Sequence, residues 1–169
     1  TDEALTALGA AARDRLGGAT VIGITGSVGK TTTKDLLAAV LRRDRTTHAN
    51  LRSFNNEIGV PLTLLGAPED SRVVVLEMGA RGVGHIATLC RIARPTVGIV
   101  TTVGKAHTSE FGSVEAVALG KGELVESLPV EGFAVLNADN PFVASMADRA
   151  EATVVTFGDT GEVRAESIT

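Results

Sequence analysis

The chain has 169 residues, of which 44% are hydrophobic, and a formal net charge of −4. This length and composition fit one globular domain with a substantial core, and the mixing of acidic with basic residues argues against a nucleic-acid-binding surface. Every apolar run is far shorter than the ~20 residues of a membrane span. The single cysteine, Cys90, excludes an intrachain disulfide and favours a reducing compartment, so we expect a cytoplasmic protein that binds neither nucleic acid nor membrane.

Short β-branched runs alternate with helical patterns along the chain, which is typical of βαβ units in a parallel sheet. The first residues are amphipathic and charged, and they predict a lead-in helix within residues 1–19. Strands are predicted over 21–25, 46–49, 73–77, 97–102, 133–137 and 153–157. Helices are predicted over 30–42, 85–93, 114–128 and 142–149, and a loop followed by a short helix over 55–65. Residues 163–169 look like the start of another strand. We therefore expect an α/β fold, a mostly parallel sheet with helices on both faces.

The loop after the first predicted strand is the most specific motif. It is broken by glycines, ends in Gly29-Lys30-Thr31 and opens a helix. Such a loop turns backbone N–H groups toward a phosphate, the lysine adds a positive charge, and the threonine hydroxyl can ligate Mg²⁺. The strict pattern has glycine where this chain has Ile24, and a chance Gly-Lys-Thr at an ordinary turn is the alternative. The motif predicts a P-loop NTPase-like domain whose nucleotide contacts are Thr25, Gly26, Ser27, Val28, Gly29, Lys30, Thr31 and Thr32.

Other candidates follow other strands, because ligands bind at the carboxyl ends of parallel strands. Glu77 ends the most apolar strand and can bind Mg²⁺, unless it is simply an acid in solvent. His107 could ligate a second metal or be an ordinary loop histidine. Lys121 lies between two glycines of a predicted helix, which indicates a close backbone approach there, although composition alone makes it a surface lysine. Asn55 and Asn56 belong to a loop that could touch a ligand or be any turn.

From about residue 20 to 169, the chain resembles the ATP-binding central domain of the Mur ligases. The likeness is greatest to the member that adds D-alanyl-D-alanine to UDP-N-acetylmuramoyl-tripeptide. It is carried by the stretches GITGSVGKTT, FNNEIGVPLTLL, EMGARGVGHI, AHTSEFGS, KGEL and LNADN, which begin at Gly23, Phe54, Glu77, Ala106, Lys121 and Leu136. The second stretch separates this member from its sister ligases and from folylpolyglutamate synthases. The family's phosphate loop also has a displaced first glycine, so Ile24 fits the family.

The resemblance implies a role for each polar candidate. Lys30 would contact the γ-phosphate of ATP, Thr31 and Glu77 would hold a first Mg²⁺, and His107 would help to hold a second. Lys121 would be the family lysine that reacts with CO₂, and its carbamate would ligate the second metal. Lys30, His107 and Lys121 would then be the catalytic residues.

The implied reaction is phosphoryl transfer from ATP to the terminal carboxylate of the UDP-muramoyl-tripeptide, followed by attack of the D-alanyl-D-alanine amine on the acyl phosphate. Asn55 and Asn56 would lie near the phosphates and the substrate carboxylate. Members of the family also have an N-terminal UDP-sugar domain and a C-terminal domain. We therefore expect residues 1–169 to be one incomplete central domain, monomeric and inactive as a ligase by itself. Three alternatives remain: another amide ligase of the superfamily, an unrelated P-loop kinase or NTPase, and a non-catalytic nucleotide-binding module.

Overall fold

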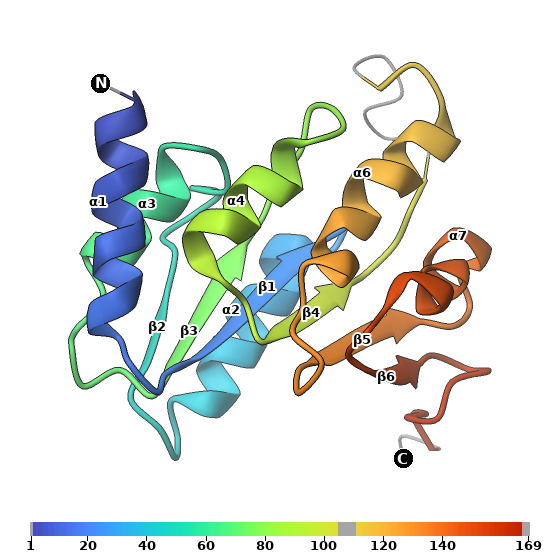
Figure 1. The fold of residues 1–169 in the computed structure, drawn as a ribbon. Coiled ribbons are helices and arrows are strands. Elements are labelled where there is room, and N and C mark those ends of the chain that lie inside the picture. Colours follow the sequence, from blue (N-terminus) through green and yellow to red (C-terminus); the bar gives the residue numbers. More distant parts are fainter. Residues whose placement is uncertain (1, 105–110, 167–169) are drawn as a thin grey trace.

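The structure, a computed structural model, describes residues 2–104 and 111–166 (Figure 1). Within these residues six parallel strands form one sheet in the order β2-β3-β1-β4-β5-β6. The strands are β1 (Thr20–Thr25), β2 (Thr47–Ala49), β3 (Val73–Glu77), β4 (Val97–Val100), β5 (Phe133–Asn137) and β6 (Thr153–Phe157). The expected parallel α/β sheet is therefore confirmed.

Helices cover both faces of the sheet. They are α1 (Asp2–Arg15), α2 (Lys30–Leu41), α3 (Gly59–Leu65), α4 (His85–Ala93), α6 (Val114–Glu126) and α7 (Pro141–Ala144), which a 3₁₀ helix, η1 (Ser145–Arg149), follows. In the described part of the chain α2 alone packs on one face, and the other helices form a layer on the opposite face (Figure 1).

Strand β3 shows why the sheet has two apolar faces. All five of its residues are buried, as expected for a strand covered on both sides. Successive side chains of a strand point to opposite faces. Val74 and Leu76 accordingly pack in the core beneath α1, α3 and α4, whereas Val73 and Val75 pack against α2.

Among the predicted boundaries that differ, two lie where a side chain binds a nearby backbone group. Strand β4 ends at Val100 instead of residue 102, and the next two residues bind the phosphate loop through the Thr101 hydroxyl and the Thr102 carbonyl. Helix α6 ends at Glu126 instead of residue 128, where the Ser127 hydroxyl donates to the Glu123 carbonyl at 2.6 Å. The helix predicted over 142–149 is divided into α7 and η1.

The C-terminal part adds one isolated bridge. Val163 pairs with Phe157 without forming a strand, so the strand expected over 163–169 does not form within the described residues. Residues 167–169 lie outside that part of the chain.

Candidate active site

The phosphate loop, residues 26–29, joins β1 to α2 at the carboxyl edge of the sheet. Gly26 and Gly29 have φ angles of +151° and +86°, which residues with a side chain rarely adopt. A Cβ atom on Gly26 would lie 1.9 Å from the Thr101 hydroxyl oxygen. The glycine spacing that departs from the strict motif therefore fits this loop, because the neighbouring chain leaves no room for a side chain at Gly26.

The residues that follow β4 hold the phosphate loop in place. The Thr101 hydroxyl donates to the Val28 carbonyl at 2.6 Å, and the Ser27 amide donates to the Thr102 carbonyl at 2.8 Å. The first N–H groups of α2 have no carbonyl four residues earlier within the helix. The loop and the start of α2 thus present backbone donors to an anion.

Lys30 begins α2, and its ammonium group turns back to donate to the Gly26 carbonyl at 2.8 Å. Burial lowers the pKa of Lys30, and the negative charge of Glu77 opposes that shift. A lysine that caps the loop in this way can exchange the carbonyl for a phosphate oxygen.

Glu77 is only 1% exposed, and both of its carboxylate oxygens accept hydrogen bonds. The Thr31 hydroxyl donates to Oε2 and the Asn55 amide donates to Oε1, each at 2.7 Å. The Glu77 backbone N–H donates to the Asn50 side-chain oxygen at 2.9 Å. The alternative of a strand-end acid in solvent is therefore wrong.

A magnesium ion fits the chemistry of this cluster. Thr31 and Glu77 offer a hydroxyl and a carboxylate beside the phosphate loop, which are the hard oxygen ligands that Mg²⁺ takes together with phosphates and water. Among the described residues, no three His, Cys, Asp or Glu side chains gather as a metal cage. Thr31 and Glu77 together suit a metal that arrives with a nucleotide.

A cavity of about 420 Å³ opens beside the cluster. It joins predicted site residues from three segments that are far apart in the sequence: Lys30, Asn55, Asn56 and Lys121. The two asparagines make different contacts. The Asn55 side chain binds the Glu77 carboxylate. The Asn56 side-chain oxygen accepts a hydrogen bond from the Gly59 amide at 2.9 Å and so holds the start of α3.

Lys121 of α6 is 1% exposed, so the alternative of a surface lysine is wrong. Burial, with a smaller contribution from the positive charge of Lys30, lowers the pKa of Lys121 to about 8. The flanking glycines make room for neighbours, as expected. A Cβ atom on Gly120 would lie 2.8 Å from Phe111 Cε1, and one on Gly122 would lie 1.8 Å from an Arg149 guanidinium nitrogen.

The remaining predicted residues are less central in this structure. Thr25 ends β1, and its buried hydroxyl oxygen has no hydrogen-bond partner among the described residues. Val28 exposes its side chain at the tip of the loop, and Thr32 is exposed in the first turn of α2. His107 lies outside the described residues.

Several residues that build the site were not predicted from the sequence. Asn50 binds the Glu77 amide, and its position directly after β2 was the available signal. On the wall of the cavity, His85 Nδ1 lies 3.2 Å from Glu57 Oε1. Glu123, from the KGEL stretch, accepts the Gly84 and Ala87 amides at 2.5 and 2.8 Å and thereby caps α4.

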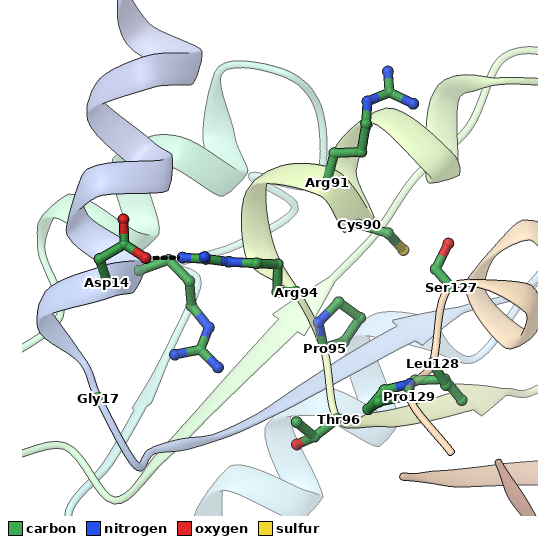
Figure 2. Close-up of a pocket in the computed structure, with 11 residues that line it drawn as sticks. Asp14, Gly17, Cys90, Arg91, Arg94, Pro95, Thr96, Ser127, Leu128 and Pro129 are labelled. Atoms are coloured by element: carbon green, nitrogen blue, oxygen red, sulfur yellow. Dashed lines mark hydrogen bonds and ion pairs between the residues drawn. The ribbon is translucent and has the colours of Figure 1, made fainter. Parts of the chain in front are cut away.

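A larger cavity of about 600 Å³ lies beside the C-terminal ends of α1, α4 and α6, away from the phosphate loop (Figure 2). Arg13 donates to the Ala93 carbonyl at 2.9 Å, and Figure 2 shows Arg94 reaching Asp14. These guanidinium groups join α1 to α4. Burial raises the pKa of the Cys90 thiol in this cavity to about 12, which leaves it unreactive. We therefore assign the chemistry to the smaller cavity.

Comparisons with known proteins relate the chain to one protein family. The family model described as the Mur ligase middle domain matches residues 24–169. The UDP-N-acetylmuramoyl-tripeptide–D-alanyl-D-alanine ligase of Mycobacterium bovis is 51% identical over 149 residues, which is 87% of this chain and 29% of that protein. The chain thus spans less than a third of that relative.

Two solved structures share the fold over nearly the whole chain. A crystal structure of MurF from Acinetobacter baumannii superposes with a TM-score of 0.95 at 34% identity, covering 100% of this chain and 38% of that one. The MurF ligase of Thermotoga maritima in complex with ADP gives a TM-score of 0.84 at 36% identity, covering 93% and 37%. In the described residues, no helix has the length and apolar character needed to cross a membrane.

Proposed function

Because the chain belongs to the Mur ligase family, we propose that it is the ATP-binding catalytic domain of a ligase that adds D-alanyl-D-alanine to UDP-N-acetylmuramoyl-tripeptide in peptidoglycan synthesis. The observation that carries the proposal is that the phosphate loop, the Glu77 cluster and the buried Lys121 meet beside one cavity. A plain kinase or NTPase would need the first two features and would have no use for a buried lysine there.

ATP would bind with its phosphates on the loop of residues 26–29 and on the start of α2. Lys30 would leave the Gly26 carbonyl and contact the γ-phosphate. The hydrogen bond to the negatively charged phosphate is stronger than the one to the neutral carbonyl. That the Thermotoga maritima relative was solved in complex with ADP supports the binding of a nucleotide.

Thr31 and Glu77 would hold a first Mg²⁺, and His107 with a modified Lys121 would hold a second. Bound there, the metal ions would offset the negative charge of the phosphates and the substrate carboxylate. Asn55 would keep the Glu77 carboxylate oriented, because it already donates to Oε1 while Thr31 donates to Oε2.

Lys121 would be carbamylated. A pKa of about 8 leaves part of the amine neutral near neutral pH, and only the neutral nitrogen can attack the carbon of CO₂. The new N–C bond forms as the nitrogen loses a proton, and the product is an anionic carbamate. This change replaces a buried positive charge beside Lys30 with a negative one, which Lys30 would stabilise.

The cavity would then hold the terminal carboxylate of the tripeptide in line with the γ-phosphate. A carboxylate oxygen attacks phosphorus and ADP leaves, which gives an acyl phosphate. The D-alanyl-D-alanine amine attacks the acyl carbon, loses its proton, and expels phosphate. Lys30 would stabilise the charge that develops on the transferred group.

The proposal also concerns the setting of the domain. We propose that it works in the cytoplasm as part of a longer, monomeric polypeptide whose other domains bind the UDP-sugar and close over ATP, and that residues 1–169 alone do not ligate. The 29% coverage of the mycobacterial relative supports the longer polypeptide.

Phosphate release from ATP by the longer ligase tests this function. Release should require UDP-N-acetylmuramoyl-tripeptide and D-alanyl-D-alanine together, and each alone, or folate with glutamate, should give none. Release without either cell-wall substrate would overturn the proposal in favour of an NTPase or kinase. A Lys121→Ala variant that keeps full activity with and without bicarbonate would overturn the role of the carbamate.

A further inference from the structure

Lys34 is a buried lysine of α2 that the proposed function does not use. It is 2% exposed, and its ammonium group donates to the carbonyls of Asn50 at 2.8 Å and Arg52 at 3.1 Å. The same nitrogen lies 3.0 Å from a carboxylate oxygen of Asp35. An ammonium group has three donors, of which two bind these carbonyls while the Asp35 carboxylate lies within ion-pair distance. Burying a charge is costly, and an apolar side chain would fill the same space at a smaller desolvation cost.

The two carbonyls belong to the loop of residues 50–56, which forms one wall of the cavity. Side chains from Leu51 to Phe54 are exposed, so this loop gains little from the hydrophobic core. Arg52 has a φ of +50°, a left-handed conformation that disfavours residues with a side chain. Lys34 binds the carbonyls of Arg52 and of Asn50. These contacts hold the loop in a conformation that the loop would not favour by itself.

The loop of residues 50–56 also fixes the position of Glu77. Asn50 accepts the Glu77 amide at 2.9 Å and donates to the Phe54 carbonyl at 3.0 Å. Phe54 is followed by Asn55, whose side chain donates to the Glu77 carboxylate and whose carbonyl accepts the Gly79 amide at 2.7 Å. Hydrogen bonds, together with the peptide bond between Phe54 and Asn55, thus connect Lys34 to Glu77.

Helix α2 therefore reaches Glu77 by two routes. Thr31 contacts the carboxylate directly, and Lys34, one turn later on the same helix, reaches it through the 50–56 loop. We propose that Lys34 is a positioning residue, which sets the loop so that Asn55 and Glu77 are placed for the metal that accompanies the nucleotide. This inference rests on the proposed nucleotide binding.

The test measures the affinity for ATP by calorimetry, with Mg²⁺ and with a chelator in its place, on the longer ligase and on its Lys34→Met variant. Methionine is unbranched and similar in length, so it fills the space without donors. The gain in affinity that Mg²⁺ gives should fall by about tenfold, because charge-assisted hydrogen bonds that place its ligands are lost. The affinity for ATP with the chelator should stay within about twofold, since the phosphate loop itself is untouched.

Asp35→Asn is the matched control, because it removes the negative charge of the exposed partner of Lys34 and leaves both carbonyl contacts. It should keep the gain that Mg²⁺ gives. If Lys34→Met does not fold, Asn50→Ala breaks the same route one link later and should show the same selective loss.

The outcomes separate the two proposals. Wild-type protein that binds no ATP, or binds it without any gain from Mg²⁺, contradicts the proposed function. Wild-type protein with that gain, together with a Lys34→Met or Asn50→Ala variant that retains it, overturns the positioning role. Equal losses with Mg²⁺ and with the chelator also overturn it, because they would indicate general damage to the fold.

Discussion

Replacing Lys121 with methionine should stabilise the folded chain, although it removes a residue of the proposed site. The pKa of Lys121 is lowered from 10.5 to about 8, and burial is the main cause. One pKa unit corresponds to ~1.4 kcal/mol, so the charged lysine costs the native state about 3 kcal/mol at neutral pH. Methionine avoids this cost. We expect Lys121→Met to raise the free energy of unfolding by about 1–3 kcal/mol in buffer free of CO₂.

The pH dependence supplies the sharper test. Between the native pKa of about 8 and the unfolded value of 10.5, the unfolded chain binds more protons at Lys121 than the native chain does. The stability contributed by this residue therefore rises with pH in that window, and the penalty is complete below it. The advantage of Lys121→Met should be greatest near neutral pH and should vanish as the pH approaches the unfolded pKa.

Urea denaturation followed by circular dichroism measures this difference, since the chain has no Trp or Tyr for intrinsic fluorescence. A variant that is less stable than the wild type near neutral pH would refute the reasoning. So would a stability difference that stays constant across the window, because the cost of a buried ammonium group must disappear once the group is neutral.

Three further substitutions or probes test other parts of the structure. Lys30→Met should weaken ATP binding by at least about tenfold in calorimetry, whereas Arg43→Met, the same charge change beyond the far end of α2, should not; equal effects would contradict a specific contact with the γ-phosphate. Gly59→Ala should lower the free energy of unfolding in urea by more than ~2 kcal/mol, because the new Cβ would lie 2.4 Å from the Phe54 carbonyl carbon; an unchanged midpoint would be unexpected. Cys90, with a pKa of about 12, should react with a thiol reagent near neutral pH only after unfolding, and rapid labelling of native protein would contradict its burial.

Much of the fold was accessible from the sequence because the local signals agreed with one another. The apolar run of β3 and the glycine-broken loop after β1 each predicted an element that the structure confirms. The boundaries that were wrong depend on a few hydrogen bonds from side chains. Thr101 and Ser127 could have continued a strand and a helix, and they instead bind the phosphate loop and the Glu123 carbonyl.

The identities of the site residues were easier to predict from the sequence than the contacts between them. Strand ends indicated Glu77, but its pairing with Thr31 and Asn55 depends on how β1 and β3 lie side by side. The burial of Lys121 was not visible in composition, because the side chains that cover α6 come from distant segments. Lys34 had no motif at all, since its partners are backbone carbonyls, which every residue carries.

The central place of β1 in the sheet has a consequence for how the chain folds. Its neighbours, β3 and β4, come much later in the sequence, so residues 20–25 find hydrogen-bond partners only after the chain has reached 73–77 and 97–100. Pairings of this kind require the closure of long loops, which makes folding slow compared with that of helical bundles. The phosphate loop, which depends on both β1 and the end of β4, cannot form before these strands meet. In a refolding experiment, nucleotide binding should therefore return only after the last cooperative step. A nucleotide should accordingly slow the unfolding of the native chain more than it speeds the initial collapse of the unfolded chain.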